Sequence, residues 1–290
     1  MTLLVVGTIP INVGDVVRGQ VSSNGDGDLI VNGEKIPHCQ GTSAMVGAAT
    51  AVCAHYGLEA PHVLLGGDIG RGEGTRAVFD GLAAEVDRVR PSVVAFHYVQ
   101  PVMKLMKRAV DELGGRDDLR LMADAGGMYA AKAASVGRSF SLMTPDVGEV
   151  GFLADPAASH PAYVSRYLFG TEDFDPAMLG KLAWELDGAE VLLIKGRQDH
   201  IIQRGEVLGI VSDPCVPELE AIGGTGDTVT GLAAGFMAAD KSTVEAAFLA
   251  AQVNREAGLA LGAQPNHHAV DLVRTFPQVL EEKEETALRA

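Results

Sequence analysis

The fold is decided by one stretch of sequence, Ala221-Ile222-Gly223-Gly224-Thr225-Gly226-Asp227-Thr228-Val229-Thr230-Gly231. Glycines surround a single carboxylate, and an apolar stripe with helical period follows at once, formed by Val229, Leu232, Ala233, Phe236 and Met237. The glycine run therefore lies at a helix N-terminus, where the first backbone N–H groups lack intrahelical partners and the helix dipole favours an anion. Because glycine has no Cβ, a phosphate can approach this backbone closely.

The carboxylate of Asp227 allows two interpretations. A phosphate would repel it, so beside an anion site it makes sense if it acts on a neutral neighbour, such as a hydroxyl group that it deprotonates. Alternatively, the run is a glycine-rich turn and Asp227 is an ordinary helix cap. The local pattern favours neither interpretation over the other.

Composition limits the class of protein. A chain of 290 residues with 47% hydrophobic and 21% charged residues fits one large α/β domain spanning residues 1–290. The net charge of −15 argues against binding to nucleic acid or anionic membranes, so local N–H groups and a few cations must hold any phosphate. The cysteines, Cys39, Cys53 and Cys215, are far apart and form no C-x-x-C pair, which argues against zinc or disulfides. With no signal-like or membrane-spanning apolar run, the sequence predicts a cytoplasmic protein.

Strands and helices are expected to alternate along most of the chain. Strands are predicted at 3–6, 62–65, 92–96, 119–123, 140–143 and 191–194, and helices at 44–56, 75–88, 102–113, 128–136, 160–168, 176–186, 228–239 and 243–261. Such alternation predicts a three-layer α/β/α fold with a mostly parallel central sheet, whose ligands bind beyond the carboxyl ends of strands. Residues 16–21 and 29–36 differ, and we expect a small β hairpin within 15–40 that projects from the body as a lid.

Polar residues follow several of these strands. Asp146 and Glu149 could share a helix face and bind magnesium through water, or they could form a capping box, which is the commoner arrangement. Lys195, Gly196 and Arg197 are either phosphate ligands or a solvated turn. His97 and Asp124 each follow a buried strand and could face the ligand, although a lone histidine there is more often structural.

Together these motifs resemble the ribokinase-like superfamily. Residues 223–228 are similar to its G-[AGST]-G-D signature, in which the backbone forms an anion hole and the aspartate activates the acceptor hydroxyl. Residues 41–56 and 66–70 look like its glycine-rich helix and its G-x-x-G-D-D-x-x-G loop. Asp146-x-x-Glu149 occupies the place of the N-x-x-E motif linked to magnesium, with Asp146 in place of the usual Asn.

The C-terminal half is closer to one branch, the ATP- or ADP-dependent NAD(P)H-hydrate dehydratases. Residues 143–149 resemble its L-T-P-H-P-G-E motif, and residues 191–196 its V-L-K-G strand and nucleotide loop. Three departures imply a changed substrate: Asp146 replaces His, Met122-Ala123-Asp124 replaces D-A-D, and residues 96–100 replace G-P-G-L-G. The lid-like hairpin points instead to sugar or small-alcohol kinases.

We therefore expect a kinase that uses ATP (or ADP) and Mg²⁺ to phosphorylate a hydroxyl group of a small metabolite. The runner-up is an NAD(P)H-hydrate dehydratase, and the third candidate is a nucleotide-binding protein without catalysis. The resemblance implies the following roles: Asp227 as base, with Gly224, Thr225 and Gly226 as the anion hole; Lys195, Gly196, Arg197, Gly223 and Asn254 at the nucleotide; Glu149 and Asp146 at the metal; and Asp15, Gly41, Asp68, His97 and Asp124 at the acceptor. Self-association would occur through the lid.

Overall fold

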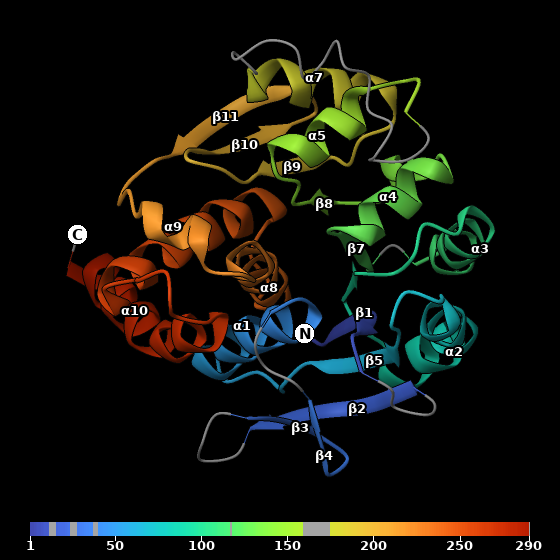
Figure 1. Cartoon of the computed structure of the whole chain (residues 1–290), viewed down its shortest axis with the longest axis horizontal. Coiled ribbons are helices and arrows are strands. Elements are labelled where there is room, and N and C mark those ends of the chain that lie inside the picture. The colour runs from blue at the N-terminus through green and yellow to red at the C-terminus, as the bar shows by residue number, and fades with distance from the viewer. Residues whose placement is uncertain (12–15, 24–27, 37–39, 117, 159–174, 290) are drawn as a thin grey trace.

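The structure is a computed structural model that describes residues 1–11, 16–23, 28–36, 40–116, 118–158 and 175–289. Its strands form one sheet in the order β11-β10-β9-β8-β7-β6-β1-β5-β2-β3-β4 (Figure 1). The parallel centre consists of β5 (His62–Gly67), β1 (Leu3–Ile9), β6 (Val93–His97), β7 (Arg120–Ala123), β8 (Leu142–Met143) and β9 (Val191–Ile194). Antiparallel strands extend both edges, namely β10 (Asp199–Gln203) and β11 (Glu206–Val211) on one side, and β2 (Val16–Ser23), β3 (Leu29–Val31) and β4 (Glu34–Ile36) on the other.

Helices cover both faces of the sheet because its central strands are apolar on both sides. Along β1, Leu3 and Val5 join one core cluster while Leu4 and Val6 join the other, as the two-residue period of a strand requires. The first cluster lies under α1 (Thr42–His55), α8 (Thr225–Ala238), α9 (Thr243–Leu261) and α10 (Ala269–Arg289). The second lies under α2 (Glu73–Val89), α3 (Met103–Leu113), α4 (Gly126–Ala133), α5 (Val147–Ala154) and α7 (Pro176–Leu186). The predicted three-layer α/β/α fold is confirmed.

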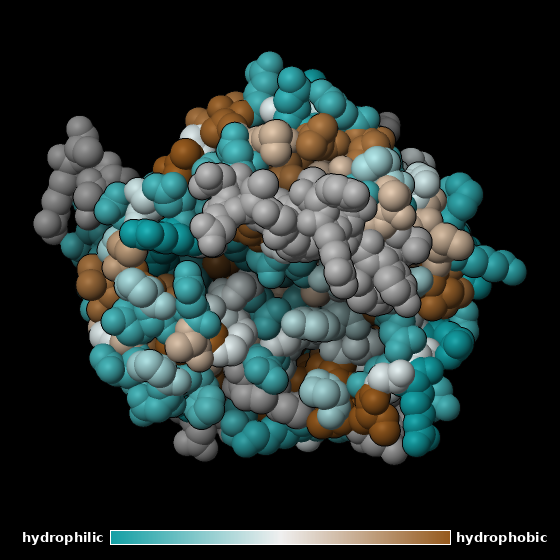
Figure 2. Space-filling view, turned by 45° about the horizontal axis from the view of Figure 1, so that its top comes forward, coloured by the Kyte–Doolittle hydropathy of each residue, from teal (hydrophilic) through white to brown (hydrophobic). Residues whose placement is uncertain are grey.

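Short 3₁₀ turns complete the connections, at η1 (Gly137–Ser139) and η3 (Pro217–Ala221). The helix expected at 160–168 lies outside the described residues. In the part of the chain that the structure describes, no helix is long and apolar enough to cross a membrane. On the face in Figure 2, hydrophobic residues occur in small separate groups among hydrophilic ones.

The N-terminal hairpin forms strands where they were expected, but it belongs to the sheet. β2 pairs antiparallel with β5, from Val16 opposite Gly66 to Gln20 opposite His62. Val17 and Val21 alternate with polar residues and are buried in the main core, so this segment is an edge of the body. Closure over a ligand and self-association through this segment stay predictions.

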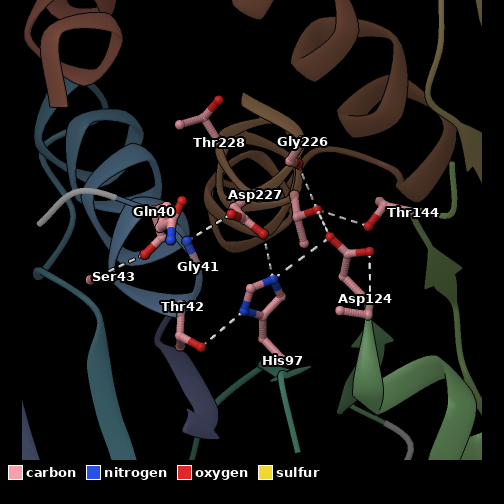
Figure 3. A network of polar contacts seen from close by, with 12 residues as sticks. Gln40, Gly41, Thr42, Ser43, His97, Asp124, Thr144, Gly226, Asp227 and Thr228 are labelled. Atoms are coloured by element: carbon pink, nitrogen blue, oxygen red, sulfur yellow. Dashed lines mark hydrogen bonds and ion pairs between the residues drawn. The ribbon is translucent and has the colours of Figure 1, made fainter. Parts of the chain in front are cut away.

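The sheet reverses its strand order at β1, and this reversal positions the site. β1 lies between β5 and β6, with α1 on one face and α2 on the other. Ligands of such sheets bind beyond the carboxyl ends of the strands at this point. Here α1 and α8 pack with their backbones in contact, because a Cβ on Gly231 of α8 would overlap the carbonyl oxygen of Met45 in α1. Their N-termini therefore converge on the carboxyl ends of β6 and β7 (Figure 3).

Candidate active site

Asp227 lies in the first turn of α8 and does not cap its own helix. That helix has no side-chain cap, and its N-cap Gly224 adopts the left-handed conformation with φ of 95°. The carboxylate of Asp227 instead accepts the backbone N–H of Gly41 at 2.7 Å through Oδ2 and contacts His97 Nε2 at 3.1 Å through Oδ1 (Figure 3). The helix-cap interpretation of Asp227 is therefore wrong, and Gly41 and His97 are brought together with it.

The start of α8 presents backbone donors to the adjacent cavity. Within the described residues, the N–H groups of Thr225, Gly226 and Asp227 donate to no acceptor in the chain. The ammonium group of Lys195 lies beside them, because Nζ is 3.5 Å from the position that a Cβ on Gly226 would take. A helix N-terminus with free amides and a lysine is suited to hold an anion.

Asp124 links this lysine to His97. It follows β7, and its carboxylate accepts Lys195 Nζ at 2.9 and 3.1 Å. The hydroxyl group of Thr230 in α8 contacts Asp124 Oδ2 at 2.5 Å, and His97 Nε2 lies 3.7 Å from the same oxygen. A continuous network of two carboxylates and two basic side chains therefore joins the ends of β6, β7 and β9 to α8.

Ionisation within the network follows from its charges. Burial opposes the ionisation of Asp227, but the hydrogen bond and charge of His97, the charge of Lys195 and the Gly41 N–H together lower its pKa. Burial likewise disfavours the charged form of Lys195, yet the negative charges of Asp124, Glu149 and Asp227 raise its pKa. Both groups are charged at neutral pH, so Asp227 is available as a proton acceptor.

Asp146 and Glu149 form the capping box that the sequence allowed. Asp146 Oδ1 accepts the Glu149 N–H at 2.7 Å, and Glu149 Oε2 accepts the Asp146 N–H at 2.9 Å. Glu149 Oε1 also accepts the hydroxyl of Tyr129 at 2.6 Å. Burial and the nearby charge of Asp124 raise the pKa of Glu149. A divalent cation would favour the ionised form of Glu149 and offset the repulsion from Asp124. Both carboxylates line the same cavity, so the donor set fits hydrated Mg²⁺.

A cavity of about 700 Å³ extends from Asp227 along the loop after β9, which is a volume typical of small-molecule sites. Its lining includes most of the predicted nucleotide residues, namely Lys195, Gly196, Arg197 and Asn254, together with Gly224, Thr225 and Gly226. Gly223 lies on the turn just before them and is exposed. Asn254 is buried in α9, where its Oδ1 accepts the hydroxyl of Thr228 at 2.7 Å.

Arg255 and Asp199 hold the loop after β9 in place and were not predicted from the sequence. Arg255 Nε donates to Asp199 Oδ2 at 2.7 Å, and its Nη2 donates to the carbonyl oxygens of Gly196 and Arg197 at 2.9 and 3.1 Å. Asp199 Oδ1 accepts the Gly196 N–H at 3.0 Å. The signal was present, because Arg255 follows Ala251 by four residues and so shares the buried side of a helix that is rich in alanine.

The remaining acceptor candidates are placed differently. Asp68 is outside the cavity lining, and its carboxylate accepts the N–H groups of Gly70, Arg71 and Gly72 at 2.9 to 3.0 Å. It thereby organises its own loop, and a substrate role for it stays a prediction. Asp15 lies outside the described residues.

Tyr98 lies within residues 96–100, which the sequence marked as a substrate-side departure, but it was not among the predicted site residues. It adopts φ of 50°, a left-handed conformation that a bulky residue rarely takes. The residue is 48% exposed and lines the cavity, and its ring stands edge-on to His97, with 4.5 Å between ring centroids. Burial and the charge of Asp227 raise the pKa of Tyr98 to about 12, so the phenol is neutral.

Comparison with known proteins identifies the family. The family model described as NAD(P)H-hydrate dehydratase matches residues 101–278. An uncharacterised protein of Methanocaldococcus jannaschii is 33% identical over 82% of this chain and 98% of its own length. The ADP-dependent (S)-NAD(P)H-hydrate dehydratase of Cenarchaeum symbiosum is 32% identical over 56% of this chain, a match that spans only 52% of that relative.

Solved structures agree on the fold. The ADP/ATP-dependent NAD(P)H-hydrate dehydratase of Bacillus subtilis, co-crystallised with ATP and Mg²⁺, superimposes with a TM-score of 0.58 at 18% identity, covering 97% of this chain and 89% of that one. Ribokinase of Thermotoga maritima superimposes with a TM-score of 0.52 at 13% identity, covering 96% of this chain and 99% of that one. At these identities the likeness shows the ribokinase-like fold alone.

These matches correct the activity expected from the sequence. The kinase interpretation relied on a separate lid and on substrate-side departures, and it is wrong. The family model that matches from residue 101 to residue 278 describes a dehydratase, and the N-terminal strands continue the sheet. The relatives support the second of the predicted activities. The chain belongs to the NAD(P)H-hydrate dehydratase family, within the ribokinase-like fold.

Proposed function

We propose that this protein is a nucleotide-dependent NAD(P)H-hydrate dehydratase, which removes water from a hydrated dihydronicotinamide nucleotide at the expense of ATP or ADP. Family membership supports this function. The observation that carries it is the position of Asp227. This ionised carboxylate lies in the first turn of α8, beside the free backbone amides of that turn and the ammonium group of Lys195. That arrangement places a proton acceptor beside a phosphate site.

The reaction would proceed in two stages at this one site. Asp227 takes the proton of the substrate hydroxyl while the terminal phosphoryl group of the nucleotide is transferred to that oxygen. The amides of Thr225 and Gly226 and the ammonium of Lys195 stabilise the charge on the moving group, the largest kind of contribution in phosphoryl transfer. The new phosphate then leaves with the oxygen, and the proton released from the neighbouring ring carbon passes to the departing phosphate, while the electron pair of that C–H bond forms the restored ring double bond.

Two further groups of residues would serve the nucleotide. Glu149 and Asp146 would hold Mg²⁺ through water, and the ion would neutralise phosphate charge. The loop after β9, fixed by Arg255 and Asp199, would line the nucleotide.

On the substrate side, the exposed ring of Tyr98 offers a face on which a planar nicotinamide-type ring can stack.

The reaction can be followed directly. Protein, Mg²⁺, ATP or ADP and hydrated NADH or NADPH are incubated together, and the near-ultraviolet absorbance of the dihydronicotinamide ring is recorded. The proposal predicts that absorbance returns when at least one of ATP and ADP is present. It predicts no recovery of absorbance when neither nucleotide is added. Consumption of nucleotide without recovery of absorbance would contradict dehydration. If no nucleotide is consumed, the protein binds nucleotide without catalysing this reaction.

Asp227→Asn tests the proposed base. The amide is isosteric and keeps an oxygen for the Gly41 N–H, but it cannot accept the hydroxyl proton. We expect turnover to fall by on the order of 10²–10⁴-fold. Binding of a non-hydrolysable ATP analogue, measured as a thermal shift, should stay nearly unchanged because the helix N-terminus is intact. Near-normal turnover of this variant would remove Asp227 from the mechanism.

A further inference from the structure

His97 is a buried imidazole that the proposed reaction does not use directly. It ends β6, and its side chain is 0% exposed. Its nearest partners belong to the site rather than to the core, because Nε2 faces Asp227 and Asp124 (Figure 3). A buried titratable group is costly unless it is paired, so its hydrogen bonds indicate what it does.

The hydrogen bonds determine which ring nitrogen carries a proton. Thr42 Oγ1 lies 2.7 Å from the carbonyl oxygen of Thr8, which can only accept, so the single hydroxyl proton of Thr42 is directed there. Thr42 Oγ1 also lies 3.0 Å from His97 Nδ1. Because its own proton is used, this oxygen must accept, and Nδ1 carries a proton.

Among the residues that the structure describes, the polar partners of the other ring nitrogen are both carboxylates. Nε2 is 3.1 Å from Asp227 Oδ1 and 3.7 Å from Asp124 Oδ2, and an ionised carboxylate offers lone pairs but no proton. A favourable contact therefore requires a proton on Nε2 as well. The ring is then an imidazolium between the two carboxylates, while Lys195 lies on the far side of Asp124. The edge-on ring of Tyr98, a further described neighbour of His97, carries no charge.

We propose that His97 is a positioning residue, an imidazolium that orients the carboxylate of Asp227 and offsets its repulsion by the phosphates of the nucleotide. This inference rests on the proposed function for its catalytic consequence. The Gly41 N–H fixes Oδ2 and the imidazolium fixes Oδ1, so the carboxylate plane is set before substrate arrives. His97 and Lys195 thus balance the two buried carboxylates beside the anion site.

The same pairing keeps Asp227 ionised. Against the effect of burial, the hydrogen bond and charge of His97 are the largest influences that lower the pKa of Asp227. Asp227 must be ionised to accept a proton, so activity falls when the pH drops through this pKa. Removing the imidazolium raises the pKa, and the acid limb of the pH–rate profile should move to higher pH.

The first experiment uses the full-length protein without ligand, so its outcome does not depend on the reaction. Nitrogen NMR of histidine-labelled protein reports the protonation of each ring nitrogen, and the His97→Gln spectrum identifies the His97 signals among the eight histidines. At pH 7 we expect both nitrogens of His97 to be protonated, and only one in Asp227→Asn. An unprotonated nitrogen on His97 in the unsubstituted protein would overturn the inference, whatever the activity proves to be.

The second experiment compares two variants in the dehydration assay. His97→Gln can still donate to Asp227 from near the Nε2 position without a charge, whereas the shorter side chain of His97→Asn reaches only toward Thr42. We expect kcat to fall on the order of 10²-fold in His97→Asn, with partial recovery in His97→Gln, because orientation is partly restored. In both variants the acid limb should move to higher pH.

A merely structural histidine would give a different result. Folding of each variant is checked by an unchanged far-ultraviolet circular dichroism spectrum. If a folded variant keeps the acid limb of the pH–rate profile where it was, the positioning role is contradicted even if kcat falls. If only His97→Gln folds, its pH profile and the NMR result decide the question. If the unsubstituted protein lacks dehydratase activity, the proposed function fails and the NMR result alone decides the state of His97.

Discussion

At the scale of single residues, the site brings negative charge together and compensates it locally. Asp227 and Asp124 are 12% and 2% exposed, and each contacts a basic side chain within 3.1 Å. Buried pairs of this kind stabilise little by themselves, because desolvation offsets their attraction. In the proposed function their value is catalytic, since a carboxylate that a bound phosphate would repel is kept charged and oriented beside the proposed phosphate site.

Tyr98 provides a residue-scale test of substrate recognition. Tyr98→Phe keeps the aromatic face, so we expect an unchanged KM for the hydrated nucleotide. Tyr98→Gly loses the stacking surface, which should raise this KM roughly 2- to 10-fold. Glycine adopts φ of 50° readily, but this variant also loses the half-buried ring and its contact with His97, so we expect little net change in stability in chemical denaturation. An unchanged KM in both variants would exclude a role for the ring in substrate binding.

At the scale of elements, the approach of α1 to α8 sets the distance between Gly41 and Asp227. Gly231 of α8 lies against the Met45 backbone of α1, so a methyl group would force the helices apart. We expect Gly231→Ala to destabilise the protein by roughly 1–3 kcal/mol and to lower kcat, since the Gly41 N–H would leave Asp227.

A matched control is Gly151→Ala in α5, where no heavy atom of the described residues outside the adjacent helix backbone lies within 4 Å of the added Cβ. It should keep full activity and gain about 0.5–1 kcal/mol, as alanine does in a helix interior. Urea denaturation and steady-state kinetics on the two variants check this pair. Full activity in Gly231→Ala would mean that the helix contact does not set the site.

The loop between β5 and α2 should contribute to stability in a pH-dependent way. Burial tends to raise the pKa of Asp68, but four backbone N–H groups lower it below the ordinary value of 3.8. A lowered pKa in the folded state contributes stability above about pH 4, and this contribution is lost as the pH falls further. Asp68→Asn should therefore be less stable by roughly 1 kcal/mol at neutral pH. The difference should disappear near pH 2 in denaturation experiments, and a difference that persists there would exclude a charge effect.

At the scale of the whole molecule, local patterns predicted most of the fold. The period-2 and period-3.6 stretches became the parallel strands and their covering helices, and the glycine-rich run became the N-terminus of α8. The partner of β2 could not be predicted, because an antiparallel edge strand is defined by pairing with β5, which lies far along the chain (Val17 opposite Leu65).

The site was predicted in part for the same physical reason. Several of the site residues named from the sequence lie at the end of a strand or the start of a helix, which marked them as candidates: Lys195, Asp124, His97 and Asp227. Their contacts, such as His97 with Asp227 across 130 positions, arise only when the sheet assembles. The choice between kinase and dehydratase depends on substrate contacts, and residues 96–100 and 122–124 departed from the family pattern there. Sequence motifs therefore described the phosphate end better than the substrate end.

The most direct test of the account is the stoichiometry of one reaction mixture. Protein, Mg²⁺, hydrated NADH and the nucleotide that supports the reaction, ATP or ADP, are combined. Recovered dihydronicotinamide absorbance, the nucleotide shortened by one phosphate (ADP or AMP) and free phosphate are measured together. The account predicts equal amounts of all three products, and loss of all three in Asp227→Asn. Shortened nucleotide formed together with a stable phosphorylated substrate, without free phosphate or recovered absorbance, would contradict it.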